Sequence, residues 1–342
     1  MNYRNLYEKK DNKKWLFLLI VGCITIALAI IIIFCLSPKN KQNIILFSCM
    51  EESREESMMN HLKERFPNYK FSLQHYSTGN CGTKLKIEGK KTEADIVVGL
   101  QCATIETISD IFADVSHIPT AEYVSPEINP NHGKYWVWEK YDGGIVVNTD
   151  ILEKEGLPEP ITYEDLLNPL YRGWIVMPSA AVSGAGYMFL NNWYNLWGEE
   201  AAFQYVESLQ LNVSQFVSSG HNVTQLLLNG ESAIGLVDLM NVYRQIRDGA
   251  PLKIIIPQTG APYNITGTGI IAGKESNPTV TEVYSYLMND YVVYDNSFFS
   301  PGGIFVKQEN NLSGYPSKIP MANMNTITDN ALKEYLTSKW KY

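Results

Sequence analysis

Residues 183–186, Ser-Gly-Ala-Gly, form the clearest candidate binding motif in this sequence. An aromatic stretch that follows is predicted to be helical through Trp197, which places the motif at a helix start. Unpaired backbone N–H groups and partial positive charge at such a start suit phosphate, phosphonate or carboxylate. An ordinary serine N-cap has the same pattern, so the sequence leaves both interpretations open.

Three further segments have the composition of ligand-binding loops. Thr78-Gly79-Asn80 could bind an anion or form a plain turn, and Ser219-Gly220 precedes a segment that Asn222 could cap. Asp238 follows a buried strand, where it either neutralises a ligand amine or caps a helix over 239–247.

The expected site collects loop residues that follow predicted strands, because ligands bind at the carboxyl ends of strands in open parallel sheets. Tyr263 is added because it lies near these loops and could stack on a ligand, although core packing is the better interpretation for most of the aromatic residues near these loops. The expected ligand-binding residues are Ser48, Cys49, Thr78, Gly79, Gln101, Ser183, Gly184, Ala185, Ser219, Asp238 and Tyr263.

Apolar runs and helical periodicities alternate along the chain. Strands are predicted over 43–48, 69–76, 94–99, 143–148, 173–178, 215–218, 233–237, 252–256 and 268–272. Helices are predicted over 51–66, 162–167, 199–209, 223–229, 278–289 and 328–340, and one more after a turn at 79–82, capped by Thr83. Alternation of this kind predicts an α/β fold with a parallel sheet and right-handed crossovers.

No sequence motif indicates catalysis or metal binding. The sequence contains no nucleophile elbow and no phosphate-binding loop of the nucleotide type, and its five histidines are scattered. Cys49, Cys81 and Cys102 each follow a predicted strand, so a Cys49–Cys81 disulfide or a soft-metal thiolate site are both conceivable. No enzyme activity, metal or cofactor is therefore expected.

Length and charge narrow the class of protein. A chain of 342 residues exceeds what one compact core usually contains, which favours two lobes or one large mixed domain. The formal net charge of -8 argues against a nucleic-acid partner, because phosphates need a basic footprint.

The N-terminal region predicts a membrane anchor. Residues 15–36 are uncharged, and at about 1.5 Å per residue they are long enough for a bilayer core of about 30 Å. Lysines concentrate before this run, which places residues 1–14 in the cytoplasm and the main domain outside, after a linker over 37–42. Two alternatives are a lipoprotein processed at Cys23 and a cleaved signal peptide.

The order of motifs resembles the extracellular solute-binding proteins of ABC importers, in the branch of ferric-ion, thiamine, phosphonate and sugar-phosphate binders. The resemblance covers nearly all of 43–310 and rests on the ordered set rather than on one motif. Its segments are Phe47-Ser48-Cys49, residues 93–99, residues 144–148 through 162–173, residues 175–186, Ser219-Gly220, residues 228–235, residues 249–251 and residues 260–263 running into 269–273.

The resemblance implies a two-lobed type 2 periplasmic-binding-protein-like fold with a hinge, preceded here by an N-terminal transmembrane helix. Lobe 1 would comprise 43–138 plus 262–342, and lobe 2 would comprise 139–261. The implied function is capture of a small, anionic ligand, a phosphonate or organophosphate, for an ABC permease in the same membrane.

Three other functions stay open beside capture for import. A membrane-anchored binder could instead serve a receptor kinase as a sensor, because both roles use one fold. Ferric-ion binders of this family use two adjacent tyrosines where this sequence has only Tyr243, which puts an iron site in doubt. An extracellular enzyme is the third alternative.

Overall fold

The computed structural model describes residues 16–22, 43–300, 302–312, 314–316 and 318–342, and the chain divides into one unit over 1–42 and another over 43–342. In the first unit, residues 16–22 form a helix. No helix in the described ranges is both long enough and apolar enough to cross a bilayer. The predicted anchor lies outside the described residues except for this short helix, as do the predicted cytoplasmic segment 1–14 and the linker 37–42.

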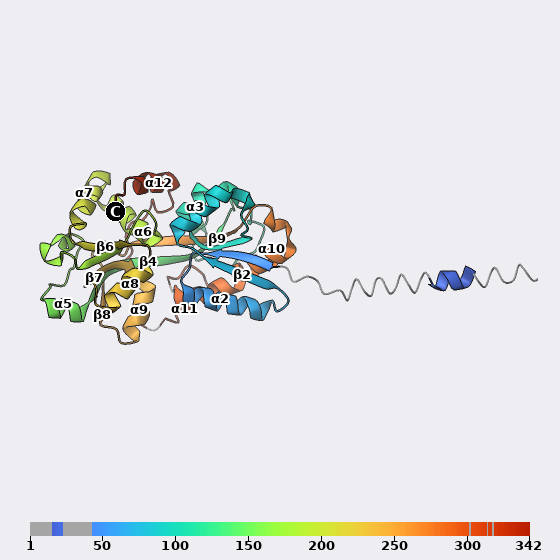
Figure 1. The fold of residues 1–342 in the computed structure, drawn as a ribbon, viewed down its shortest axis with the longest axis horizontal. Helices are drawn as coiled ribbons and strands as arrows, with labels where there is room; N and C mark the ends of the chain where they lie inside the picture. Colours follow the sequence, from blue (N-terminus) through green and yellow to red (C-terminus); the bar gives the residue numbers. More distant parts are fainter. Residues whose placement is uncertain (1–15, 23–42, 301, 313, 317) are drawn as a thin grey trace, which may run out of the picture. The chain divides into compact units, whose positions relative to one another are not determined.

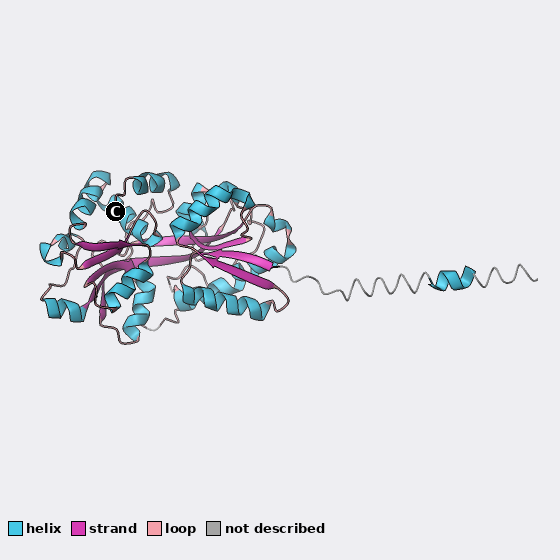
Figure 2. Ribbon diagram, in the orientation of Figure 1, coloured by secondary structure: helices cyan, strands magenta, loops and turns pink. Residues whose placement is uncertain are grey.

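The unit over 43–342 is built on a mixed sheet of nine strands with helices on both faces (Figure 1, Figure 2). The order of strands is β2-β1-β3-β9-β4-β7-β5-β6, and β8 pairs with β4. The strands are β1 (Asn43–Ser48), β2 (Lys70–His75), β3 (Ile96–Gln101), β4 (Trp136–Asn148), β5 (Ile175–Pro178), β6 (Val213–Val217), β7 (Ile234–Asp238), β8 (Leu252–Ile255) and β9 (Tyr263–Ile270).

Strand directions differ from the expected parallel sheet. β1 runs parallel to β2 and β3, and β5 runs parallel to β6 and β7, as strand–helix–strand alternation predicts. β9 is antiparallel to β3 and β4, and β4 is antiparallel to β7 and β8. The wholly parallel sheet was therefore wrong, because β4 and β9 are long strands that join the two sides of the sheet rather than closing a strand–helix–strand unit.

Most helices follow a strand directly. The α-helices described in the unit over 43–342 are α2 (Glu52–Arg65), α3 (Thr78–Glu88), α4 (Cys102–Thr107), α5 (Thr149–Glu155), α6 (Gly184–Trp197), α7 (Glu199–Leu209), α8 (Gly220–Leu228), α9 (Leu239–Arg247), α10 (Pro278–Tyr286), α11 (Val292–Phe299) and α12 (Asn330–Ser338). The turn expected over 79–82 is instead the first turn of α3. Its N-cap is Ser77, whose hydroxyl accepts from the Asn80 amide, and not Thr83.

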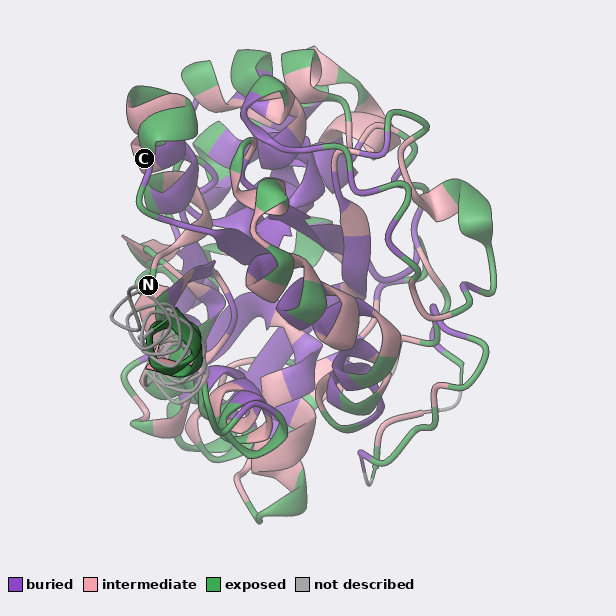
Figure 3. Cartoon of the chain, turned by 90° about the vertical axis from the view of Figure 1, so that its right-hand side faces the viewer, coloured by how far each residue is buried: buried purple, intermediate pink, exposed green. Residues whose placement is uncertain are grey.

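Buried side chains form separate hydrophobic cores. Figure 3 colours the chain by burial, with many buried residues in the central strands. The first core gathers β1, β2, β3, α2, α3 and α10, and these elements are called the first half. The second and third cores gather β5, β7, α6, α7, α8 and α9, and these are called the second half. β4 contributes Trp138 to the first core and Ile145 to the second, so it passes from one half to the other.

The C-terminal segment packs differently from the predicted division into lobes. Residues 262–342 were all expected in lobe 1, but Met324, Ile327, Leu336 and Trp340 are buried in the second core. Helix α12 therefore belongs to the second half, although its Lys333 reaches residues of the first half. Spacing along the chain predicts that this segment is a helix, but it does not predict which core buries it.

Candidate ligand-binding cleft

A cleft of about 940 Å³ is lined by residues of both halves. The N-terminal residues of five helices line it, two from the first half and three from the second. Their N-cap residues are Glu51 of α2, Ser77 of α3, Ser183 of α6, Ser219 of α8 and Asp238 of α9. Because each helix start has unpaired N–H groups and partial positive charge, this arrangement favours binding of anionic or strongly polar groups.

Ser183 has the capping role that its sequence permits and also lines the cleft. Its hydroxyl accepts from the Gly186 amide at 3.4 Å. The amides of Gly184 and Ala185 lie in the first turn, where a helix has no internal acceptor for them. Asn264 of β9 donates to the Gly184 carbonyl at 3.0 Å and fixes this loop against the strand that joins the halves.

The two halves touch at one edge of the cleft, around Gly184. A methyl group on Gly184 would lie 3.2 Å from the Tyr141 hydroxyl and 3.4 Å from the Thr78 hydroxyl. A side chain at this position would therefore crowd both hydroxyl groups, and glycine does not. Beside it, the Gly79 amide of α3 donates to the Val182 carbonyl at 3.2 Å. The Gly79 amide, expected to be free for a ligand, is therefore occupied by a contact between the halves.

The structure brings most of the expected site residues together. Those that line the cleft are Cys49, Thr78, Ser183, Gly184, Ala185, Ser219 and Asp238. Gly79 and Gln101 line a smaller adjoining pocket, which shares Thr78, Ser183 and Gly184 with the cleft. Ser48 is buried and accepts from the Met50 amide at 3.2 Å, and Tyr263 lies under the Lys140 ammonium, so neither lines these two pockets.

Carboxylates outnumber cationic side chains along the cleft. The carboxylates are Glu51, Glu52, Glu55, Glu56, Glu139 and Asp238, and the cations are Arg54 and Arg244. Burial, followed by the charges of Glu51 and Glu139, raises the pKa of Asp238 to about 7. The protonated form of Asp238 can donate a hydrogen bond, and its ionised form can only accept.

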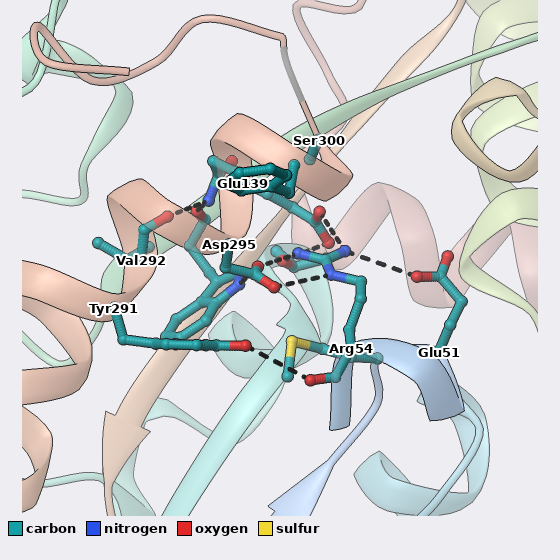
Figure 4. A network of polar contacts seen from close by, with 12 residues as sticks. Glu51, Arg54, Glu139, Tyr291, Val292, Asp295 and Ser300 are labelled. Carbon is teal, nitrogen blue, oxygen red and sulfur yellow. Dashed lines mark hydrogen bonds and ion pairs between the residues drawn. The ribbon is translucent and has the colours of Figure 1, made fainter. Parts of the chain in front are cut away.

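A buried arginine lies at the floor of the cleft (Figure 4). The Arg54 Nη1 donates to Glu139 Oε2 at 2.6 Å, and its Nε and Nη2 donate to the carboxylate of Asp295. Trp138 Nε1 donates to the same carboxylate at 2.8 Å, and Glu51 lies 3.8 Å from Nη1. The arginine therefore connects α2 of the first half to β4 and α11.

Burial and charge act in opposite directions within this network. Burial lowers the pKa of Arg54, but the carboxylates of Asp295, Glu139 and Glu51 raise it by more, so the net direction is upward. Burial raises the pKa of Glu139, although the Arg54 charge opposes it. Because its positive charge is already shared between two carboxylates, Arg54 orders the cleft floor more than it attracts an anion.

The list of expected binding residues omitted Arg54, Glu139, Tyr141 and Arg244. The Arg244 Nη2 donates to the Phe298 carbonyl at 3.3 Å, and its guanidinium lies 4.4 Å from the centre of the Phe299 ring. A signal was available for Arg54 and Arg244, since each lies in the first two turns of a helix whose start was predicted at a strand end. No local signal marks Glu139, whereas Tyr141 belongs to a group of aromatic residues over 135–141; both residues lie inside β4.

The cysteines are free thiols in the described part of the chain. Cys49 and Cys81 are neighbours, and the hydrogen bond to Cys81 together with burial raises the pKa of the Cys49 thiol. The conceivable disulfide is thus not formed here. Among the residues that the structure describes, no group of three histidine, cysteine, aspartate or glutamate side chains could ligate a metal.

Solved structures of periplasmic binding proteins share this fold. The periplasmic binding protein AfuA from Actinobacillus pleuropneumoniae, with exogenous fructose-6-phosphate bound, is 20% identical, and the match covers 88% of this chain and 98% of that one with a TM-score of 0.73. The periplasmic binding protein P5PA is 21% identical over 88% of this chain and 100% of its own, with a TM-score of 0.70.

Sequence comparison agrees with the fold. A Haemophilus influenzae protein described only as uncharacterized is 34% identical over 134 residues, which are 39% of this chain and 39% of that protein. The family model of the bacterial extracellular solute-binding proteins matches residues 108–297, more than half of the chain. The chain therefore belongs to the family of bacterial extracellular solute-binding proteins.

Proposed function

We propose that this protein captures a small phosphorylated or phosphonate compound in the cleft by hinge closure and delivers it unchanged to an ABC importer. The convergence of five helix N-termini from both halves on one cleft is the observation that carries the proposal. A ligand that contacts both halves stabilises the closed arrangement, since it binds that state better than an open one.

The anionic group of the ligand would lie at Thr78, Ser183 and Gly184, which line both the cleft and the smaller adjoining pocket at the starts of α3 and α6. The rest of the ligand would then face Glu51 and Asp238. Carboxylates accept hydrogen bonds from hydroxyl or ammonium groups, so the acidic side of the cleft suits a sugar or an amine. The fructose-6-phosphate bound to AfuA is a compound of this type.

The hinge would be formed by β4 and β9, which contribute to both halves. Tyr263 at the start of β9 packs against both the first and the second cores. Rotation about these strands would separate Gly79 from Val182 and open the cleft at that edge.

Fructose 6-phosphate is expected to raise the Tm of the full chain in detergent, whereas fructose is expected to have a smaller effect. Ligand at about 100 times its Kd adds about 2.7 kcal/mol to the stability of the folded state. If neither fructose 6-phosphate nor methylphosphonate raised the Tm at millimolar concentration, the proposed ligand class would be wrong.

A matched pair of variants localises the effect. Thr78 and Thr149 are each the first residue of a helix, but only Thr78 lines the cleft, while Thr149 donates to the Pro251 carbonyl at 3.1 Å. T78V is expected to reduce the ligand-induced rise in Tm, and T149V is expected to preserve it. Equal rises in both variants would remove Thr78 from the site.

We also propose that the uncharged run over 15–36 anchors the protein in the membrane with the domain over 43–342 outside the cytoplasm. The anchored form is expected to stay in the membrane pellet after alkaline carbonate extraction, and added protease is expected to digest the domain in intact spheroplasts. Release of the full-length chain by carbonate would contradict an anchor.

A further inference from the structure

A small pocket of about 170 Å³ adjoins the cleft beneath helix α12. It is lined by α3, by the loop before α6, by Gln101 and Thr104, and by one side of α12. At about 30 Å³ per water molecule, the volume exceeds that of several waters and has room for a phosphate-sized group.

The ammonium of Lys333 lies in this pocket without an acidic partner. It donates to Gln101 Oε1 at 2.5 Å and to the Thr104 hydroxyl, and it lies 5.4 Å from the centre of the Tyr187 ring. None of the carboxylates in the described ranges forms an ion pair with it. Burial lowers the pKa of Lys333 to about 7, as expected for an ammonium that lacks a counter-charge.

Gln101 supplies a second and independent sign of a missing acceptor. Its side chain is 1% exposed, and its Nε2 has no hydrogen-bond partner among the described residues. Gln101 Oε1 faces Lys333 and accepts a hydrogen bond from it, so Nε2 is the group of this amide that remains without a partner. The NH2 group is therefore a buried donor with no acceptor, and such groups are rare in folded proteins.

The charges around the pocket are the reverse of those in the cleft. Its lining contains Lys333 and Lys86 against one carboxylate, Glu334, which lies 3.4 Å from the Lys86 ammonium. The remaining polar lining groups include the hydroxyls of Thr78 and Thr83. Unsatisfied donors and a net positive lining together favour a ligand that only accepts hydrogen bonds.

We propose that this pocket binds one phosphate-sized oxyanion, which accepts hydrogen bonds from Lys333 Nζ and Gln101 Nε2. The ion would supply the counter-charge of Lys333 and the acceptor that Gln101 lacks. Because Lys333 belongs to a helix of the second half and Gln101 to a strand of the first, the ion would tie α12 across the two halves. Binding at this site goes beyond solute capture in the cleft and does not require that capture to occur.

Titration calorimetry of the full chain in detergent with inorganic phosphate tests the site directly. Wild type is expected to bind phosphate near neutral pH, and K333M is expected to bind at least about tenfold more weakly, because it loses a charge-assisted hydrogen bond. K341M is the control, since Lys341 is exposed and outside the pocket. Absence of phosphate binding by wild type at millimolar levels, or equal binding by K333M, would overturn the proposal.

A second variant separates loss of binding from loss of folding. Q101E has nearly the same shape and places a carboxylate beside Lys333, where it would form the missing ion pair. Q101E is expected to unfold at a higher temperature than wild type and to bind no phosphate. A Q101E variant that still bound phosphate as wild type does would exclude Gln101 from the site.

Competition identifies the source of the oxyanion. If saturating fructose 6-phosphate removes the phosphate titration in wild type, and K333M also weakens the binding of fructose 6-phosphate, the pocket receives the phosphoryl group of the captured solute through Thr78, Ser183 and Gly184, which border both spaces. If phosphate binds with unchanged heat beside fructose 6-phosphate, or if the sugar phosphate does not bind, the ligand is the free ion. Either result supports oxyanion binding in the pocket. Failure of fructose 6-phosphate to bind would contradict only the proposed solute class.

Discussion

R54M is expected to lower the free energy of unfolding by about 3–5 kcal/mol, the range typical for breaking a buried ion pair by removing one partner. Arg54 is 1% exposed, and its guanidinium is the cation that faces the buried carboxylates of Glu139 and Asp295. The variant leaves both carboxylates in a site of low dielectric without a counter-charge. Chemical denaturation followed by tryptophan fluorescence, for which Trp138 is part of the network, measures the loss.

The pH dependence of this loss follows from the same charges. Without Arg54, burial raises the pKa of Glu139 unopposed by that positive charge, so the deficit of R54M is expected to shrink as the pH falls. R65M is the matched control, because Arg65 lies in the last turn of the same helix and is exposed, with its guanidinium 5.2 Å from the Phe66 ring centre. A loss in R54M no larger than in R65M would show that the network does not stabilise the fold.

Lys333 is expected to make wild type progressively more stable as the pH rises from about 7 to 10.5, relative to K333M. Burial lowers the pKa of this lysine in the folded state from 10.5 to about 7. Between these values the unfolded chain binds the proton and the folded chain does not, so stability rises with pH across the window. Below it, the charged lysine is paired with no carboxylate and destabilises the fold, by on the order of a few kcal/mol.

Thermal or chemical unfolding of both proteins at several pH values measures the difference. K333M also removes the donor to Gln101 and Thr104, which adds a loss that does not depend on pH, so the informative quantity is the change of the difference with pH. K341M is the control because its lysine is exposed. A constant difference between wild type and K333M across the window would mean that Lys333 keeps its proton in the folded state. Saturating phosphate is expected to flatten the difference, because an anion restores the ammonium.

Local patterns predicted many of the elements that border the cleft. The strand over 43–48 and the helix over 199–209 agree with β1 and α7 to the residue. Ser183 was predicted at a helix start, and its hydroxyl does cap α6. These features depend on residues no more than about four positions apart, so the chain specifies them wherever the segment packs.

The loop residues show where local reasoning stopped. Strand ends that were predicted to converge do line one cleft, but Ser48 is turned into the core and Gly79 is bonded to the opposite half. Strand-end position predicts which edge of the sheet a residue occupies. It does not predict whether the side chain or amide is free, since that depends on what the facing half presents.

Residues of the cleft floor and of the small pocket could not be found from spacing. Arg54 meets Asp295 across 241 positions of sequence, and Lys333 meets Gln101 across 232. Such contacts arise only after the antiparallel strands β4 and β9 and the returning C-terminal segment have placed α11 and α12. The sequence gives the charge of each partner, but it does not predict which distant residue that partner will contact.

From the sequence by itself came the alternation of strands and helices, the Ser183 cap of α6 and an uncharged N-terminal run long enough to cross a bilayer, because each of these is a property of neighbouring residues. Only the tertiary structure decided that β4 and β9 are antiparallel, that α12 packs on the second core, and that a buried arginine and a lysine without an acidic partner border the binding space. These depend on the packing of distant segments, in which burial and the position of opposite charges determine the energy of each group.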